Sequence, residues 1–459
     1  MKLVYGVKDK PKTSQVLVFA LQQLLAILAA TIAVPAIIGN GMSQSAALFG
    51  AGVGTIVYLL FTKFKSPVFL GSSFAFLGSM GTAFAGAVSA AAGYAGLLLG
   101  AFFAGLVYVV IAIIVKFCGV KWISKLMPAV VIGPTVAIIG LSLAGNAIGD
   151  LFKGNVTHVE NVWALSEENE AILTEVSVQN ASVYLCIICG LVTLAVTVIC
   201  SVYGKKMLKM IPFIIGIAAG YAVAAIFTAI GNAADIASLQ IINFSAFSDM
   251  HWLPDFTFIT AFKGFGDLDA SYIGTIAVAY VPVAFVVFAE HIADHKNLSS
   301  IIESDLLEEP GLHRTLLGDG VGSMAGAFFG GCPNTTYGES VGCVAISGNA
   351  SVVTILTTAV LALLAAFVAP FTTFLSTIPS CVMGGTCISL YGFIAVSGLK
   401  MLQPVDLGDN GNLFTASVIL IAGIGGMTVS FGKVTITEVA CALILGILVN
   451  RLVNIKKSK

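Results

Sequence analysis

The sequence predicts an all-α polytopic membrane protein, and three observations support this fold class. Of the 459 residues, 58% are hydrophobic and only 10% are charged, whereas soluble proteins carry about 25% charged residues. The mean hydropathy is +1.00. Apolar runs of about 20 residues, each long enough to cross a bilayer as a helix, recur along the whole chain. The net charge of −1 gives no indication of a nucleic-acid partner.

The first apolar run directly follows Met1–Ser14, a segment with four lysines. A cleavable signal peptide would have a shorter apolar region that ends in a small-residue cleavage site. We therefore expect this run to stay in the protein as the first membrane span. Six more spans follow in the first half, so that seven are predicted near 15–39, 45–62, 67–86, 92–116, 128–149, 182–203 and 211–231.

The second half contains seven further apolar runs, which brings the prediction to fourteen transmembrane segments. The third and tenth segments are short and are interrupted by glycine and proline. The second seven lie near 272–294, 314–331, 335–349, 351–374, 378–399, 412–431 and 435–454.

The distribution of Lys and Arg predicts the orientation. With the N-terminus inside, all but three of the 22 basic residues fall in cytoplasmic segments, the exceptions being Lys153, Lys263 and Lys433. Cytoplasmic loops of membrane proteins carry an excess of Lys and Arg. We therefore expect a multi-pass protein of the plasma membrane, surrounded by lipid, with both termini in the cytoplasm and with external loops at 150–181 and 231–271.

The third and tenth segments resemble each other weakly. Ser66–Phe74 and Cys332–Gly338 each place proline and glycine around polar residues with an aromatic residue nearby, and each segment is third in its set of seven. Because seven is an odd number, the second set would be inverted in the membrane. Paired broken helices in an inverted repeat indicate a substrate site near the bilayer midplane.

Two carboxylates are expected inside the membrane. Glu339 follows a Pro- and Gly-containing break and begins a half-helix, where it would cap free N–H groups and still contact a substrate. Glu290 follows fifteen largely apolar residues, and Asp294 lies on the same helical face one turn later. For Asp294, His291 and His295 the alternative is a helix end whose side chains reach the membrane interface. Charged residues within spans are rare and usually functional.

These groups suit a planar ligand with alternating N–H donors and carbonyl acceptors. The two carboxylates accept hydrogen bonds, and backbone N–H groups at Gly338 and near Phe74 donate them. Tyr337, Phe74 and Tyr391 would supply flat apolar walls. Two acids in a low-dielectric site are not both ionised cheaply, so one should hold a proton, as proton-coupled uptake requires. The acids would repel an anion, whereas a pyrimidine or purine base fits.

Several motifs occur together in this chain. They are Phe288–His295 (FAEHIADH), Glu309–Arg314 (EPGLHR), Pro333–Glu339 (PNTTYGE), Leu70–Phe76 (LGSSFAF), Met383–Gly385 and Leu390–Gly392. Through them the chain resembles, over nearly its whole length, the nucleobase–ascorbate transporter family, and most of all its bacterial uracil permease branch.

The resemblance implies a fold of fourteen spans in two inverted repeats of seven, with short extended strands facing each other in spans 3 and 10. Spans 1–4 and 8–11 would form a core domain, and spans 5–7 and 12–14 a gate domain. The corresponding ranges are 1–149 (core spans 1–4 and the start of the gate, span 5), 150–271 (gate spans 6–7 with external loops), 272–374 (core spans 8–11) and 375–459 (gate spans 12–14).

The resemblance also implies uracil import coupled to protons, without a further cofactor and in a homodimer. Glu290 and Glu339 would accept hydrogen bonds from the base, and the amides of Phe74 and Gly338 would donate to its carbonyls. Tyr337 and Tyr391 would line the pocket. Ser73 is a further expected substrate-binding residue, and the expected proton-coupling residues are Glu290, Glu339 and Asp294.

Two departures from the family pattern leave alternatives open. Ser340 stands where the family often has Asn, and Asp294 stands where one branch has His. Xanthine, uric acid or another nucleobase is therefore a second substrate hypothesis, and sodium a second coupling ion. An anion exchanger of the same architecture is a third hypothesis, against which the two acids argue.

An enzyme is the least expected class, because no nucleophile–base set or metal cluster stands among the polar residues of the spans. Cys186 and Cys189 form a CxxC without a second pair or a flanking His, so we interpret them as small buried hydrophobic residues.

Overall fold

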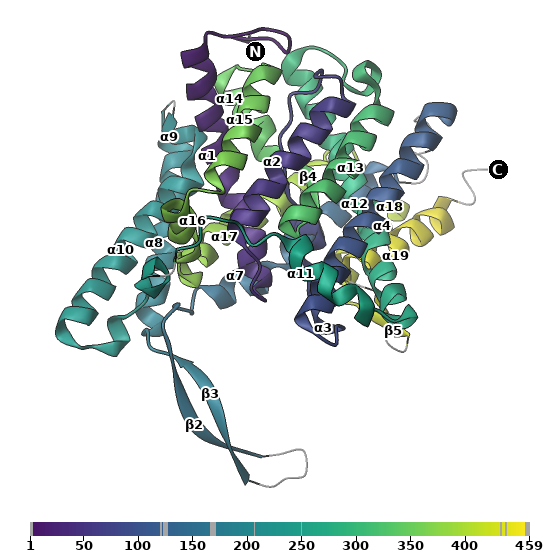
Figure 1. Ribbon diagram of the computed structural model, residues 1–459. Coiled ribbons are helices and arrows are strands. Elements are labelled where there is room, and N and C mark those ends of the chain that lie inside the picture. The colour runs from purple at the N-terminus through teal and green to yellow at the C-terminus, as the bar shows by residue number, and fades with distance from the viewer. Residues whose placement is uncertain are drawn as a thin grey trace. The chain divides into compact units, whose positions relative to one another are not determined.

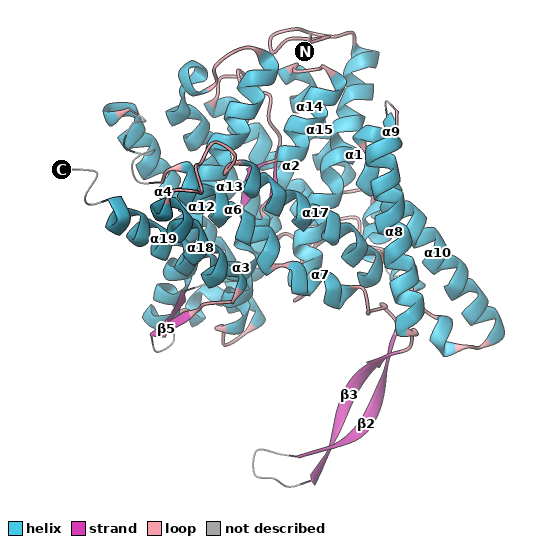
Figure 2. Cartoon of the chain, turned by 180° about the vertical axis from the view of Figure 1, so that it is seen from behind, coloured by secondary structure: helices cyan, strands magenta, loops and turns pink. Residues whose placement is uncertain are grey.

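The computed structural model describes residues 3–119, 122, 127–165, 171–205, 207–248, 250–431, 434–436 and 438–454. Helices make up most of this described part, and its strands are short except in one hairpin (Figures 1 and 2). Several lysines on which the predicted orientation depends lie outside the described residues, namely Lys2, Lys121, Lys125, Lys206, Lys433, Lys456, Lys457 and Lys459.

Helices in the first half of the chain coincide with the predicted apolar segments, and the third segment begins with a strand. The elements are α1 (Thr13–Ile38), α2 (Gln44–Phe61), β1 (Leu70–Ser72), the short 3-10 helix η1 (Phe74–Phe76), α3 (Leu77–Ala85), α4 (Ala90–Cys118), α6 (Ala129–Ser142), α7 (Ala144–Asp150), β2 (Thr157–Leu165), β3 (Ala171–Gln179), α8 (Val183–Tyr203), α9 (Met207–Met210) and α10 (Pro212–Ala234).

The second half repeats this order of elements, with a strand again at the third of its apolar segments. The elements are α11 (Thr257–Gly264), α12 (Ala270–Ile302), α13 (Leu312–Gly330), β4 (Asn334–Thr336), α14 (Gly338–Ser347), α15 (Val352–Ala365), α16 (Ala369–Ser376), α17 (Ser380–Lys400), α18 (Asn410–Ile424), β5 (Val429–Phe431), β6 (Val434–Ile436) and α19 (Glu438–Asn454).

Eight helices of the described chain are long and apolar enough to cross a membrane: α1, α2, α4, α6 with α7, α8, α10, α12 and α17. Helices α15 and α16 add a ninth if they form one span bent by 84°. Helices α3 and α14 are shorter, because β1 and β4 occupy the beginning of their segments. The protein is therefore a polytopic helical membrane protein, and the number of fourteen spans stays a prediction.

Helices α2 and α13 approach closely because glycines line their contact. A Cβ atom built on Gly50 would lie 2.4 Å from the carbonyl oxygen of Gly326, and one built on Gly54 would lie 2.7 Å from that of Gly322. The Nδ2 of Asn334, the first residue of β4, donates to the Gly50 carbonyl oxygen at 3.0 Å. Small residues thus let the two backbones meet, and Asn334 fastens β4 to α2.

The chain divides into two compact units. One comprises residues 1–143, 252–372 and 390–459, and the other comprises residues 144–251 and 373–389. Within the second unit, the antiparallel hairpin β2–β3 extends away from α8 and α10 (Figures 1 and 2). The predicted assignment of spans to core and gate domains stays a prediction.

We expect Gly326→Ala to lower the thermal unfolding temperature of the detergent-solubilised protein, because the added Cβ would lie 2.1 Å from Asn334 Nδ2. Overpacking of a filled interior destabilises by about 1–3 kcal/mol. Gly274→Ala in α12 is the matched control, since a Cβ at that position meets no heavy atom within 4 Å. Equal unfolding temperatures of the two variants would contradict the close contact between Gly326 of α13 and Asn334 of β4.

Candidate functional site

The two strands that interrupt the helical segments pair with each other. Leu70–Ser72 of β1 runs antiparallel to Asn334–Thr336 of β4, residue for residue. The pairing continues beyond the strands, where the Ser73 amide donates to the Pro333 carbonyl oxygen at 2.9 Å. Backbone groups that leave a helix inside a membrane need internal partners. Each broken segment therefore satisfies the backbone of the other.

Tyr337, directly after β4, covers this strand pair. Its amide donates to the Phe69 carbonyl oxygen at 3.2 Å, and its hydroxyl donates to the Ser72 carbonyl oxygen at 2.9 Å. A Cβ at Gly71 would lie 2.3 Å from the Tyr337 ring. Only glycine at position 71 leaves room for this ring. The local sequence pattern did not reveal this steric requirement.

Each strand leads directly into the N-terminus of a helix. Phe74 begins η1, which continues into α3, and Gly338 begins α14. The first N–H groups of a helix have no partner within it and carry a partial positive charge. The antiparallel pairing places the two helix starts at the two ends of this short ladder, and both Phe74 and Gly338 line one pocket.

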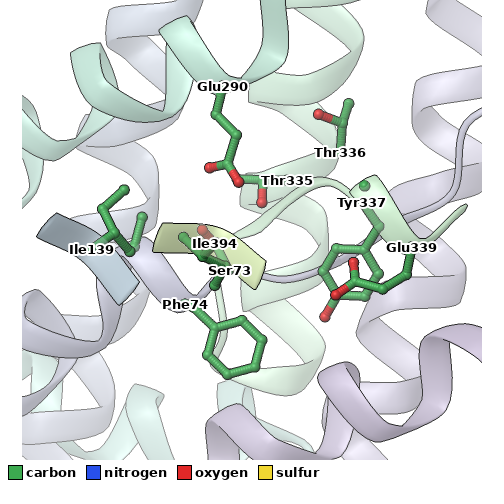
Figure 3. Close-up of a pocket in the computed structure, with 11 residues that line it drawn as sticks. Ser73, Phe74, Ile139, Glu290, Thr335, Thr336, Tyr337, Glu339 and Ile394 are labelled. Carbon is green, nitrogen blue, oxygen red and sulfur yellow. The ribbon is translucent and has the colours of Figure 1, made fainter. Parts of the chain in front are cut away.

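A pocket lies where the two helix starts meet α12 (Figure 3). Figure 3 shows the Glu290 side chain extending from α12 toward Thr335. Tyr391 does not line this pocket but packs edge-on against the Phe74 ring, with centroids 5.6 Å apart. The other six predicted substrate-binding residues all line it: Ser73, Phe74, Glu290, Tyr337, Gly338 and Glu339.

The sequence analysis missed part of the pocket wall. Thr335 and Thr336 line the pocket, and their place in the PNTTYGE motif was a signal that could have identified them. Ile139 of α6 and Ile394 of α17 also line it. Each is one apolar residue in a largely apolar helix, and no local pattern separates it from a residue that faces lipid. Ala75 of η1 completes the wall.

The three predicted proton-coupling residues lie close to one another. Glu290 and Glu339 both line the pocket. Asp294, one helical turn after Glu290, accepts a hydrogen bond from the Thr336 hydroxyl at 2.9 Å through its Oδ2. Asp294 therefore contacts the pocket through Thr336 rather than directly.

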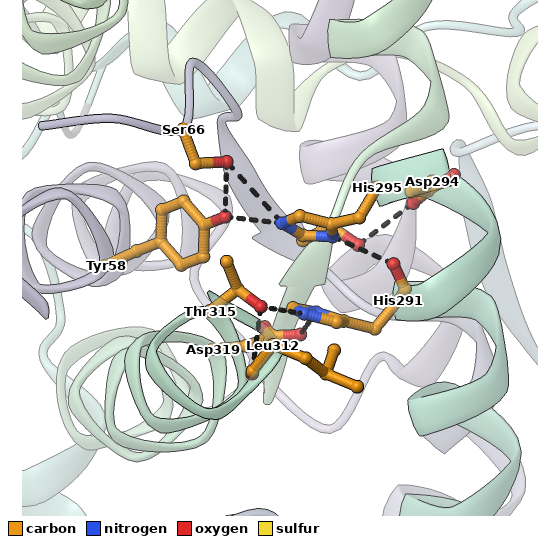
Figure 4. A network of polar contacts seen from close by, with 9 residues as sticks. Tyr58, Ser66, His291, Asp294, His295, Leu312, Thr315 and Asp319 are labelled. Carbon is orange, nitrogen blue, oxygen red and sulfur yellow. Dashed lines mark hydrogen bonds and ion pairs between the residues drawn. The ribbon is translucent and has the colours of Figure 1, made fainter. Parts of the chain in front are cut away.

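His291 and His295 lie behind the pocket in a buried polar network (Figure 4). Both side chains are 0% exposed, so neither reaches the surface of the protein. The His291 Nδ1 lies 2.7 Å from Asp319 Oδ2, and its Nε2 lies 3.0 Å from the Thr315 hydroxyl. The two imidazole rings stack with their centroids 4.0 Å apart. The network joins α12 to α13.

The second histidine joins α12 to α2. The His295 Nδ1 donates to the His291 carbonyl oxygen at 2.8 Å, so in a neutral ring Nε2 is the acceptor. The Tyr58 hydroxyl lies 2.7 Å from this Nε2 and 2.7 Å from the Ser66 hydroxyl. Buried polar groups are paired in this way when the interior is dry.

Asp319 is a residue that the sequence analysis missed, although an acid in an apolar, glycine-rich segment was an available signal. It is 1% exposed. While His291 Nδ1 contacts its Oδ2, its buried Oδ1 has no hydrogen-bond partner among the described residues. Asp319 holds the ring of His291 in place, and His291 follows Glu290 directly in the sequence.

Ser340 connects three elements next to the acid Glu339. Its hydroxyl accepts a hydrogen bond from Gln23 Nε2 of α1 at 2.6 Å and another from the Phe69 amide, ahead of β1, at 3.1 Å. Ser340 is 0% exposed. Ser340 thus holds the start of α14 against α1 and the first broken segment.

A family model described as "Permease family" matches residues 14–431. The uracil permease of Bacillus caldolyticus is 38% identical to this chain, over 98% of this chain and 94% of that protein. The uracil permease of Bacillus subtilis is also 38% identical, over 98% and 95%. The uracil permease of Escherichia coli is 33% identical, over 96% and 92%.

Solved structures of membrane transporters share the fold. The transmembrane domain of the cyanobacterial bicarbonate transporter BicA superposes with a TM-score of 0.61 at 14% identity, covering 96% of this chain and 98% of that one. The murine solute carrier 26 family member A9, an anion transporter in the inward-facing state, gives 0.65 at 14% identity, covering 98% and 70%.

These findings confirm the family predicted from the motifs and the multi-pass membrane class. The identities to the solved structures are too low to indicate more than the fold. The match over most of its length shows that the chain belongs to the permease family that includes the bacterial uracil permeases.

Proposed function

We propose that this chain is a secondary active transporter that imports uracil together with protons by alternating access. The observation that carries the proposal is the pocket in which two helix starts and two carboxylates converge. The names of the relatives, which are 33–38% identical over nearly their whole length, support uracil as the substrate. The strand pair holds the substrate between the third and tenth segments and α12.

The pocket complements the hydrogen-bonding edge of a pyrimidine base. The N–H groups of Phe74 and Gly338 donate to the two carbonyl oxygens of uracil, and Glu290 and Glu339 accept from its two ring N–H groups. Tyr337 provides a flat wall beside them. A site built to pair every polar group of its substrate rejects analogues that leave one unpaired. This pairing favours uracil over xanthine and uric acid, whose second ring needs further room.

The carboxylates provide the route for proton coupling. Among the described residues that line the pocket none is Lys or Arg, so no nearby cation offsets Glu290 and Glu339. Isolated charges are expensive to hold inside a membrane protein. We infer that one carboxyl, with Asp294 one turn away, takes up a proton when substrate binds and releases it inside. Sodium would be the coupling ion if proton gradients had no effect.

The arrangement of the helices supports an inverted repeat of two sevens. The order α1, α2, β1, α3, α4 recurs as α12, α13, β4, α14, α15. Corresponding contacts recur as well: α4 with α13 matches α15 with α2, and α12 with α4 matches α1 with α15. The antiparallel strand pair fits two copies of opposite direction. We propose that these copies form fourteen spans with both termini in the cytoplasm, in a homodimer.

We further propose that spans 1–4 and 8–11 move as a core against spans 5–7 and 12–14 as a gate. The pocket combines residues from both proposed domains. Ser73, Glu290 and Glu339 belong to the core, and Ile139 and Ile394 belong to the gate. A relative movement of the two would therefore open the pocket to one side of the membrane at a time.

Uptake of radiolabelled uracil into proteoliposomes tests the proposal as a whole. We expect uptake to rise when an inward proton gradient is imposed, because the proton carried on a carboxyl moves with the substrate. Uptake that does not change with the proton gradient but rises with a sodium gradient would show that sodium is the coupling ion. If the protein took up xanthine and not uracil, the proposal that uracil is the substrate would be wrong. Sulfate or chloride flux without any nucleobase uptake would overturn the permease proposal.

We expect Glu290→Gln to lower uracil uptake at least about tenfold, because a hydrogen bond to a charged group contributes about 1.5–3 kcal/mol. The variant also removes the proton-carrying carboxyl. Glu303→Gln is the matched control, since Glu303 is an exposed residue that ends the same helix. Normal uptake by Glu290→Gln in proteoliposomes would remove Glu290 from the mechanism.

We expect Ser340→Ala to raise the KM for uracil by up to about thirtyfold, because two neutral hydrogen bonds of about 1 kcal/mol each are lost. The effect acts by displacing Glu339, so Ser340 is a positioning residue. The double variant with Gln23→Ala should be less than additive, since the two side chains share one hydrogen bond. A loss of thermal stability with an unchanged KM would show a purely structural role.

A further inference from the structure

A second cavity adjoins the substrate pocket. Phe74, Ala75 and Ile139 line both spaces. On its far side the second cavity is lined by Ser142 of α6 and Glu438 of α19, together with Gly78, Ser79, Leu143 and Val439. We call this space the outer cavity.

Two of the shared residues, Phe74 and Ile139, carry large apolar side chains. The Phe74 ring is 8% exposed, and the edge-on contact with Tyr391 holds it in place, with the ring planes at 80°. Figure 3 shows the Phe74 ring pointing away from Glu290, with Ile139 at the side of the pocket. A ligand that passed from one space to the other would come into contact with these two side chains, because both of them line both spaces.

The outer cavity lies toward the external side in the proposed orientation. Helix α3 starts at the pocket and leads through Gly78 and Ser79 toward the loop before α4, which that orientation places outside. Helix α19 starts at Glu438 and ends near the cytoplasmic C-terminus. The cavity walls also come from both proposed domains, with α3 in the core and α6 and α19 in the gate.

We propose that the outer cavity is the closed external section of the substrate path, and that Phe74 and Ile139 form the barrier between it and the pocket. This inference rests on the proposed function. Separation of α3 from α6 and α19 would widen the cavity and release the barrier together, because both share the same residues. Uracil would then meet Ser142 and Glu438 before it reaches Glu290.

The chemistry of the outer cavity suits the same substrate class. Among the residues described, its one charged side chain is that of Glu438, a carboxylate that accepts hydrogen bonds from ring N–H groups and repels anions. The ordinary role of a Glu in the first turn of a helix is to stabilise the helix N-terminus. If that were its only role, substitution of Glu438 would change the stability of the protein alone. A position on the substrate path predicts that substitution also weakens substrate capture.

Chemical modification of Ser142→Cys tests the path without disturbing folding. Membrane-impermeant methanethiosulfonate reagents of increasing size are added from outside to cells or oriented proteoliposomes, and uracil uptake is measured. We expect loss of uptake that grows with reagent size, because the adduct fills the outer cavity. Leu141→Cys is the matched control, since Leu141 precedes Ser142 on α6, does not line the cavity and is 36% exposed.

The parent chain treated with the same reagents is the control for modification of the native cysteines. Uptake by modified Ser142→Cys equal to that of the treated parent would overturn the proposed path. Inhibition only by reagent added from the cytoplasmic side would place the cavity on the other face and would overturn it as well. If the untreated parent took up no uracil, the proposed function itself would fail, so the two failures are distinguishable.

Equilibrium binding separates the cavity from the pocket. After modification in detergent, Ser142→Cys should still bind uracil, which a thermal-shift titration measures, because the barrier keeps the adduct out of the pocket. Loss of binding would show that the two spaces are one and that no barrier exists.

Glu438→Gln should raise the KM for uptake about tenfold, the effect of losing one charge-assisted hydrogen bond, without changing the binding constant in detergent. An unchanged KM would remove Glu438 from the path.

Discussion

The pairing of β1 with β4 is the constraint on which the rest of the site depends. Each strand interrupts a helical segment and leaves backbone N–H and C=O groups without helical partners, which is costly at membrane depth. The two interruptions satisfy each other through an antiparallel ladder. The ladder therefore links two distant parts of the chain and fixes where α3 and α14 begin. Those two helix starts, and the donors that they carry, make up one wall of the pocket.

Close helix packing and a buried polar network hold this ladder in position. Glycines in α2 and α13 let the backbones meet, and Asn334 ties β4 to the carbonyl oxygen of Gly50. Behind the pocket, His291 pairs with Asp319 of α13, and His295 contacts Tyr58 of α2. Buried hydrogen-bonded networks of this kind favour one arrangement of the helices over others. Glu290, on the same helix as both histidines, is thereby held at a fixed depth opposite the strands.

The fold by itself does not determine the substrate. The solved structures that share the fold are named as a bicarbonate transporter and an anion transporter. In this chain Glu290 and Glu339 line the pocket, and two carboxylates oppose the binding of an anion. Function belongs to the site rather than to the fold. For this reason the proposed substrate follows from the acids, the helix starts and the relatives, and not from the architecture.

The sequence by itself determined the membrane class, the family and most of the pocket residues, because hydropathy, helix-breaking Pro and Gly, and motifs such as FAEHIADH and PNTTYGE are properties of short segments. The tertiary structure alone decided which side chains meet. Ile139 and Ile394 look like any apolar residue of a membrane helix, and the contact of Asp294 with Thr336 joins segments far apart in the chain. The physical reason is that helix faces are turned toward one another by packing and by the strand ladder, neither of which is encoded in a local pattern.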